Sequence, residues 1–196
     1  KFAFDAEGKI VGFLIQPAPT AEAVPPVAAD APFTEQDVSV GDGERALPGT
    51  LAMPKGDGPF PAVVLVHGSG PQDRNETIGP NRPFLDIARG LAAQGIAVLR
   101  YEKRTKARPQ DFASGEFTVD DETTNDAVLA VDALRKTAGI DPNRVFVLGH
   151  SQGGMMAPRI AAVSGHVDGL ILLAAPSRPL LDILIEQNRR LAALND

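Results

Sequence analysis

The chain has 196 residues, of which 43% are hydrophobic, and carries a net charge of −6. This composition is typical of a globular protein with one core, and the mild acidity argues against a nucleic-acid-binding surface. No apolar run is long enough to span a membrane, and a chain without cysteine has neither a disulfide nor a thiolate metal site.

The first 30 residues are predicted to precede the main domain. Residues 1–16 contain two short apolar runs around a turn, which predicts a β-hairpin at the end of a larger domain. Residues 17–30 are rich in proline and alanine, so we expect a semi-rigid linker. The chain begins at Lys1 without methionine, which indicates a processed or trimmed start. Export to the periplasm or beyond is one interpretation, but the sequence leaves the compartment unknown.

Residues 31–196 are predicted to form an α/β domain. Alternating strands and helices indicate a mostly parallel sheet flanked by helices. The run 62–66 is entirely apolar, as is typical of a strand buried on both faces. We expect strands at 33–40, 44–53, 62–66, 96–99, 144–148 and 169–174, and helices at 84–94, 118–138, 155–163 and 180–194.

The most informative motif is the pentapeptide 149–153, which has the form G-x-S-x-G around Ser151. It follows the apolar strand at 144–148 and precedes a helix-compatible stretch, a context typical of the nucleophile elbow of serine hydrolases. The sharp turn needs small residues two positions either side of the serine. It also places the hydroxyl at a helix N-terminus, where backbone N–H groups can bind an oxyanion. Ser151 is therefore the predicted nucleophile.

A second glycine-containing loop, residues 67–70, follows the strand at 62–66. Ligands of parallel sheets bind beyond the carboxyl ends of the strands, so this loop and Ser151 are expected to face one crevice. A dinucleotide fingerprint beginning at Gly68 and Gly70 would need glycine at position 73, which is Asp73. We therefore reject nucleotide binding, and we expect no metal and no organic cofactor.

These motifs resemble the α/β-hydrolase fold, and more narrowly the bacterial serine esterases with their serine-peptidase-like relatives. The resemblance covers residues 38–176 and depends on four segments, residues 67–70, 73–74, 100–104 and 149–153. It implies that Ser151 is the catalytic nucleophile and that the backbone N–H groups of Ser69 and Gln152 form the oxyanion hole. The implied substrate is a small-molecule carboxylic ester with a short acyl chain. Peptidase, thioesterase and acyltransferase chemistry stay open.

Roles are also expected for segments outside the elbow. Residues 1–16 resemble the closing strands of an accessory domain, and residues 177–196 the start of a lid-like helical segment. An ion pair between Asp73 and Arg74 is expected to stiffen the oxyanion loop, and the basic run 103–108 is expected to be a solvated loop. The residues expected to line the substrate pocket are His67, Gly68, Gly70, His150 and Met155.

The general base is the main gap in this interpretation. The resemblance implies a triad in the order Ser, Asp or Glu, then His, but only three histidines are present. His150 adjoins the nucleophile and should diverge from it, and His67 is expected to shape the loop. His166 follows a helix that carries it roughly 18 Å away from Ser151. We therefore expect the triad Asp and His to lie outside this chain.

The apolar run 170–173 is expected to be an open sheet edge, which is a hazard for association unless it is covered. A homodimer, a second fragment completing the sheet, or the helix at 180–194 are the expected covers. The alternative function is a catalytically incomplete, hydrolase-like binding or assembly module. The activity of the chain in isolation is left open.

Overall fold

The computed structural model describes residues 2–4, 8–13 and 23–194. Strands β1 (Phe2–Phe4) and β2 (Ile10–Phe13) pair antiparallel, which gives the two strands of the expected hairpin. Most of its turn and residues 17–22 of the expected linker lie outside the described residues. Residues 23–30 are irregular and mostly exposed.

The main domain is built on one mixed, mostly parallel sheet of six strands in the order β3-β4-β6-β5-β7-β8. Strands β3, β4 and β6 pair antiparallel in turn, whereas β6, β5, β7 and β8 run parallel. The strands are β3 (Phe33–Val40), β4 (Leu47–Pro54), β5 (Phe60–Val66), β6 (Ala97–Tyr101), β7 (Ile140–His150) and β8 (Gly169–Leu173). The predicted α/β class and sheet are confirmed.

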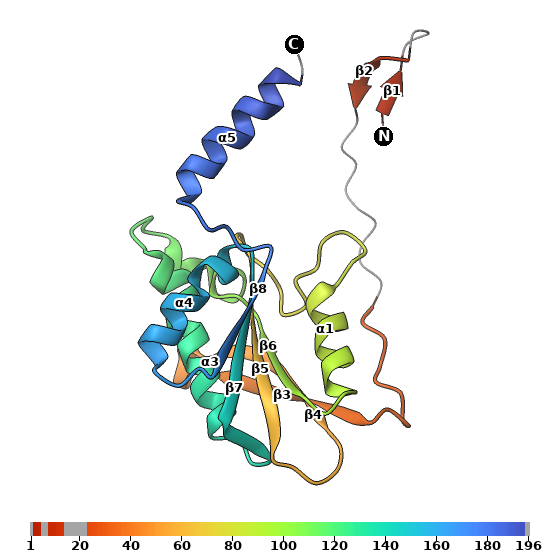
Figure 1. Ribbon diagram of the computed structural model, residues 1–196, viewed down its shortest axis with the longest axis vertical. Coiled ribbons are helices and arrows are strands. Elements are labelled where there is room, and N and C mark those ends of the chain that lie inside the picture. The colour runs from red at the N-terminus through yellow and green to blue at the C-terminus, as the bar shows by residue number, and fades with distance from the viewer. Residues whose placement is uncertain (1, 5–7, 14–22, 195–196) are drawn as a thin grey trace.

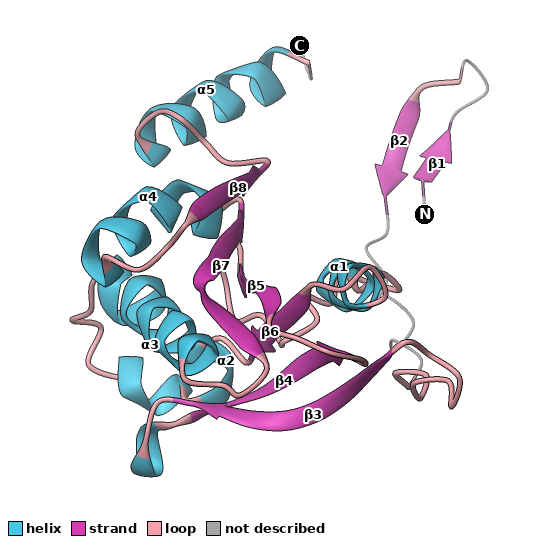
Figure 2. Cartoon of the chain, turned by 60° about the horizontal axis from the view of Figure 1, so that its bottom comes forward, coloured by secondary structure: helices cyan, strands magenta, loops and turns pink. Residues whose placement is uncertain are grey.

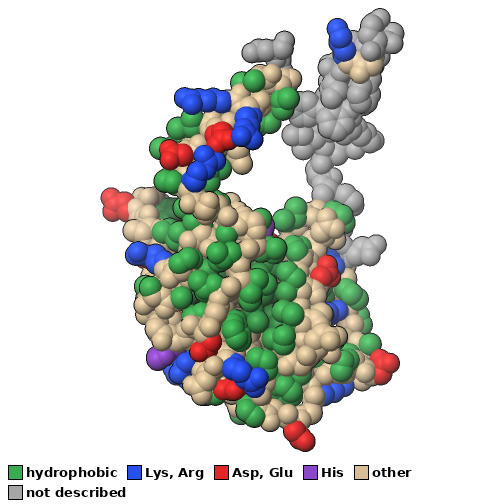
Figure 3. Space-filling view, in the orientation of Figure 1, with side chains coloured by type: hydrophobic (Ala, Val, Ile, Leu, Met, Phe, Trp, Pro, Cys, Tyr) green, Lys and Arg blue, Asp and Glu red, His purple; other side chains and the backbone are tan. Residues whose placement is uncertain are grey.

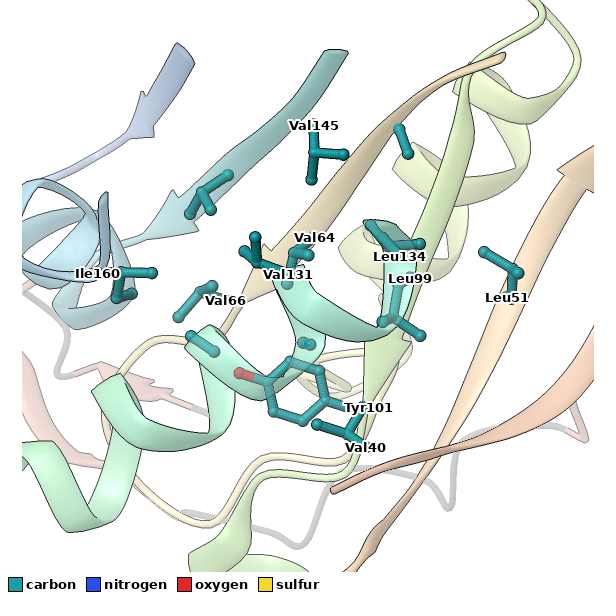
Figure 4. Packing of buried hydrophobic residues seen from close by; sticks show 14 of the residues in the cluster. Val40, Leu51, Val64, Val66, Leu99, Tyr101, Val131, Leu134, Val145 and Ile160 are labelled. Carbon is teal, nitrogen blue, oxygen red and sulfur yellow. The ribbon is translucent and has the colours of Figure 1, made fainter. Parts of the chain in front are cut away.

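Helices cover both faces of this sheet (Figures 1 and 2). Alternation along β5 explains the two layers, because successive side chains point to opposite faces of a strand. Val64 and Val66 pack on one face with α3 (Asn125–Arg135) and α4 (Gln152–Ser164), whereas Val63 and Leu65 pack on the other face with α1 (Pro83–Ala92). Figure 4 shows the larger of these clusters, with Val131 and Leu134 of α3 facing the strands.

The helices are α1 (Pro83–Ala92), α2 (Arg104–Ala107), α3 (Asn125–Arg135), α4 (Gln152–Ser164) and α5 (Leu180–Ala193), with short helical turns at Gly43–Arg45, Pro109–Phe112 and Asp120–Thr124. The expected helix at 118–138 is shorter and less regular than predicted. The Asp121 carboxylate accepts the N–H and the hydroxyl of Thr118, the Asp121 N–H donates to that hydroxyl, and a π-helical turn precedes α3. Within the described ranges, no helix combines the length and apolarity that a bilayer crossing requires.

Strand β8 forms an apolar edge of the sheet. Its side chains stay exposed from Leu170 to Leu173, with Leu172 at 52%. Figure 3 shows hydrophobic side chains gathered on the face where β8 lies in Figure 1. Helix α5 stands away from the sheet, and its own Leu181 and Leu191 are also exposed. Of the three alternative covers expected for this edge, the helix at 180–194 is therefore ruled out in this structure.

Candidate active site

Ser151 occupies a tight turn between the end of β7 and the start of α4. Its φ of 51° and ψ of −112° are strained for a residue with a Cβ. A Cβ on Gly149 would lie 2.3 Å from the Gly153 carbonyl oxygen, and one on Gly153 would lie 2.3 Å from the Val66 oxygen. The turn therefore accepts only glycine at these two positions, as the motif predicts.

The backbone of Ser151 is held on two sides. Its N–H donates to the Leu173 carbonyl of β8 at 2.9 Å, and its carbonyl accepts from the N–H of Met155 in α4 at 2.9 Å. Strained backbone persists only where the surroundings hold it in place, and here the sheet and the helix do so.

The loop after β5 lies directly beside this turn. Parallel pairing of β5 with β7 sets Val66 opposite Gly149, so both strands end at the same edge of the sheet. A Cβ built on Gly68 would lie 3.4 Å from the Cβ of Ser151. The structure thus brings together the two loops that were expected to share a crevice.

The backbone N–H groups of these loops differ in availability. The N–H of Gly68 donates to the carboxylate of Glu76 at 2.7 Å. In contrast, the N–H groups of Ser69 and Gln152 donate to no other group in the described part of the chain. The two predicted oxyanion donors therefore have no acceptor within these described residues, whereas the neighbouring Gly68 amide has one.

Asp73 and Arg74 do not form the ion pair expected between them, and each bonds to other groups. The Asp73 carboxylate accepts the backbone N–H groups of Asn75 and Thr77 at 2.9 and 3.1 Å. Burial alone would raise the pKa of Asp73, but the hydrogen bonds from Thr77 and Asn75 outweigh it and lower the pKa. Arg74 pairs instead with Glu102 at 2.8 Å.

A buried polar network lies behind the two loops. The Lys103 ammonium donates to the Gly68 carbonyl at 2.9 Å and to Oε1 of Gln152 at 3.0 Å, and it pairs with Glu122 at 2.7 Å. Burial lowers the pKa of Lys103, and the bond to Glu122 opposes that shift. The expectation of a solvated basic loop is therefore wrong here, because Lys103 is only 2% exposed and Arg104 is also buried.

None of the three histidines is hydrogen-bonded to the Ser151 hydroxyl within the described residues. His150 Nδ1 lies 2.9 Å from the Glu76 carboxylate. His166 is exposed beyond the C-terminus of α4. The side chain of His67 is 1% exposed and packs between the rings of Phe84 and Tyr101, so it belongs to the core and does not line a pocket as expected.

Met155 lines a largely apolar cavity of about 520 Å³ beside the elbow. Leu172 of β8, Pro158 of α4 and the loop after β8, residues 175–179, complete its wall. Gly70, with a φ of +88°, lies in the loop after β5, and neither it nor Gly68 nor His150 lines this cavity as expected. Across the described ranges, no group of three or more His, Asp or Glu side chains converges in a way that would hold a metal ion.

Sequence reasoning missed Glu76, Lys103 and Glu122 as parts of this site. Nothing in the pattern around Glu76 marks it, although its φ of 51° and its 1% exposure set it apart in the structure. Lys103 lies in a segment that carries the resemblance, and this was the available signal. The run of charges around it instead suggested a solvated loop.

Comparison with known proteins agrees with this geometry. Residues 63–195 match the Alpha/beta hydrolase family. The chain is similar to Esterase EstD of Thermotoga maritima, with 46% identity over 97% of this chain and 44% of that protein. It is also similar to the putative esterase NocK of Nocardia uniformis subsp. tsuyamanensis, with 31% identity over 74% of this chain and 45% of that protein. The chain thus spans less than half the length of these two relatives.

Solved structures share the same fold. A dienelactone hydrolase from Anabaena variabilis superposes with a TM-score of 0.56 at 26% identity, covering 71% of this chain and 62% of that one. The dienelactone hydrolase-like phosphotriesterase P91 from metagenomic libraries gives a TM-score of 0.58 at 20% identity, covering 73% and 59%. A strained serine elbow on a mostly parallel sheet defines the class of α/β-hydrolase-like proteins. This chain belongs to the Alpha/beta hydrolase family.

Proposed function

We propose that the protein is a serine hydrolase that cleaves carboxylic esters with Ser151 as its nucleophile. The strained turn that presents Ser151 to the loop at 67–70 is the observation that carries the proposal. The relatives named as esterases, at 46% and 31% identity, favour ester substrates over peptides and thioesters.

In the proposed reaction, the Ser151 oxygen attacks the ester carbonyl carbon and gives its proton to a base. The carbonyl oxygen becomes an oxyanion, which the free N–H groups of Ser69 and Gln152 bind. Collapse of this intermediate releases the alcohol and leaves an acyl group on Ser151, and water then hydrolyses the acyl-enzyme. Loss of one oxyanion donor raises the barrier by about 3–4 kcal/mol.

The base in this proposal is a histidine outside these 196 residues, oriented by an Asp or Glu that also lies outside them. The positions of the three described histidines support this, because one is in the core, one is bonded to Glu76 and one is beyond α4. Removal of a triad histidine costs orders of magnitude in kcat. The chain alone should therefore bind and position an ester better than it turns one over.

The acyl group is proposed to be short and to bind near Met155. The cavity of about 520 Å³ beside the elbow and its apolar wall support this. A series of p-nitrophenyl esters from acetate to decanoate tests acyl length. The value of kcat/KM is expected to be highest for acetate or butyrate. A maximum at octanoate or longer would contradict the assignment.

Further polypeptide is proposed to pair with the apolar edge at β8, since exposed edges of this kind invite association. It comes either from the rest of the protein or from a second copy. We also propose that α5 is the start of a lid-like segment and that residues 1–16 contain the last strands of an accessory domain. Light scattering on the full-length gene product distinguishes a monomer, whose own residues cover the edge, from a dimer.

Labelling by a fluorophosphonate probe tests the nucleophile. Wild-type full-length protein should be labelled and should hydrolyse p-nitrophenyl acetate, whereas Ser151→Ala should do neither. Ser114→Ala, in an exposed loop, serves as the matched control and should behave as wild type. Absence of labelling in the wild type would instead support a hydrolase-like binding or assembly module.

A further inference from the structure

Lys103 links the two backbone segments that carry the proposed oxyanion donors. An ammonium group has three N–H donors, and Lys103 uses them on the Gly68 carbonyl, the Gln152 side chain and the Glu122 carboxylate, at 2.9, 3.0 and 2.7 Å. Its side chain is only 3% exposed. One buried cation thus contacts both sides of the crevice.

The contact with Gly68 acts directly on the Ser69 donor. The carbonyl of Gly68 and the N–H of Ser69 belong to the same peptide unit, which is planar and trans, so the two groups point in opposite directions. A cation that holds the carbonyl from behind therefore fixes the direction of the N–H. It also polarises the peptide unit, which makes the N–H a stronger donor.

The contact with Gln152 constrains the second donor. Its side chain accepts from Lys103 through Oε1 and donates through Nε2 to Glu122 at 3.1 Å, so it is held at both polar atoms. Because the backbone N–H of the same residue is the other free donor, Lys103 sets the spacing between the two donors.

Stability alone gives little reason for a lysine at this position. Burying an ammonium and a carboxylate costs desolvation energy, and apolar residues of similar volume are often as stable or more so. A buried positive charge beside the place where negative charge develops has a different benefit. It favours the oxyanion over the neutral carbonyl, and so acts on the transition state.

We propose that Lys103 is a positioning residue of the oxyanion hole, which aims and strengthens the Ser69 N–H and sets its spacing from the Gln152 N–H. The proposal rests on the proposed function of Ser151. It requires that substitution of Lys103 lower kcat and weaken the binding of tetrahedral transition-state analogues, with little change in KM.

The test compares Lys103→Met with Lys106→Met in the full-length gene product. Lys106 is an exposed lysine of α2, the short helix that follows Lys103, and provides the matched control. The assay measures kcat and KM for p-nitrophenyl acetate and the inhibition constant of phenylboronic acid, a tetrahedral mimic. Lys103→Met should lower kcat about 10- to 100-fold and raise the inhibition constant of phenylboronic acid by a similar factor, whereas KM should stay within about threefold of the wild-type value. The control should match wild type.

A folded Lys103→Met protein with kcat and boronate affinity within about twofold of wild type would overturn the proposal. If that variant does not fold, Gln152→Leu removes one of the contacts while the cation keeps Gly68 and Glu122 as partners. That variant should lose about 3- to 10-fold in kcat and in boronate affinity, and unchanged values would overturn the proposal. A wild-type protein that neither hydrolyses the ester nor is labelled at Ser151 overturns the proposed function itself, and the role of Lys103 with it.

Discussion

The carboxylate of Glu76 lies 2.9 Å from Nδ1 of His150, and the same oxygen accepts the N–H of Gly68 at 2.7 Å. A single buried oxygen therefore links the residue before the proposed nucleophile to the loop that carries the first proposed oxyanion donor. It also engages the Gly68 amide, whereas the Ser69 amide, a proposed oxyanion donor, has no acceptor among the described residues. Pre-organisation of this kind costs nothing during the reaction, because the groups are already in place.

The first prediction is that Glu76→Ala destabilises the protein and Glu76→Gln does so less. Alanine leaves the buried Gly68 N–H without an acceptor, which costs about 1–3 kcal/mol in the free energy of unfolding. Glutamine keeps an acceptor oxygen for the Gly68 N–H. Both variants keep a side chain at the positive φ of position 76, so backbone strain does not distinguish them. Urea unfolding of the two proteins measures the difference. Equal stability would mean that the Gly68 amide finds another partner.

The second prediction concerns the glycine of the elbow. Gly153→Ala should lower the free energy of unfolding by at least about 3 kcal/mol, since its new Cβ would meet the Val66 oxygen at 2.3 Å, a backbone atom that cannot rotate away. The same substitution at Gly90, in an exposed part of α1 with nothing within 4 Å, should instead stabilise the protein by about 0.5–1 kcal/mol. Changes of opposite sign in the melting temperatures of the two variants support the packing argument. A Gly153→Ala protein as stable as wild type contradicts it.

Local patterns explain which parts of this site could be predicted from the sequence. The elbow at Ser151 needs only its neighbours at 149 and 153, and the parallel strands bring residues 67–70 to it by topology. Lys103 is different, because its partners are 35 and 49 positions away in the sequence. A run of charged residues is most often solvated, and only tertiary packing decides that this one is buried.

His67 is an instructive intermediate case. It was expected at the rim of the crevice because it follows the last residue of β5. Continued alternation with Val63 and Leu65 instead carries its ring to the α1 side of the sheet, where Phe84 lies 5.2 Å away. The alternation of side chains along the strand, continued by one residue to position 67, predicts that the His67 ring lies on the α1 side of the sheet.

The third prediction contrasts two Arg–Asp pairs. The guanidinium of Arg104 donates to both carboxylate oxygens of Asp126, at 2.9 and 2.6 Å, with both side chains largely buried. Asp126→Ala removes these buried charge-assisted hydrogen bonds and leaves Asp111 as the remaining carboxylate partner of Arg104, so it should cost about 3 kcal/mol of stability. Asp120, which pairs with Arg159 at the surface, is the control. Asp120→Ala should leave the unfolding midpoint nearly unchanged, and a comparable loss in both variants would contradict the role of burial.

The fourth prediction is that His67 contributes to acid sensitivity. Burial, aided by the nearby Lys103 charge, lowers the pKa of His67 from 6.5 to about 3 in the folded protein. Between these values the unfolded chain binds a proton at this site and the folded protein does not, so stability is complete above pH 6.5 and falls as the pH decreases towards 3. The slope approaches about 1.4 kcal/mol per pH unit for one such group. His67→Phe, which keeps an aromatic ring between Phe84 and Tyr101, should remove that part of the slope in urea unfolding measured from pH 7 to pH 4.5. His166→Gln, at an exposed site, should retain it, and an unchanged slope in His67→Phe would show that His67 is already protonated in the folded state.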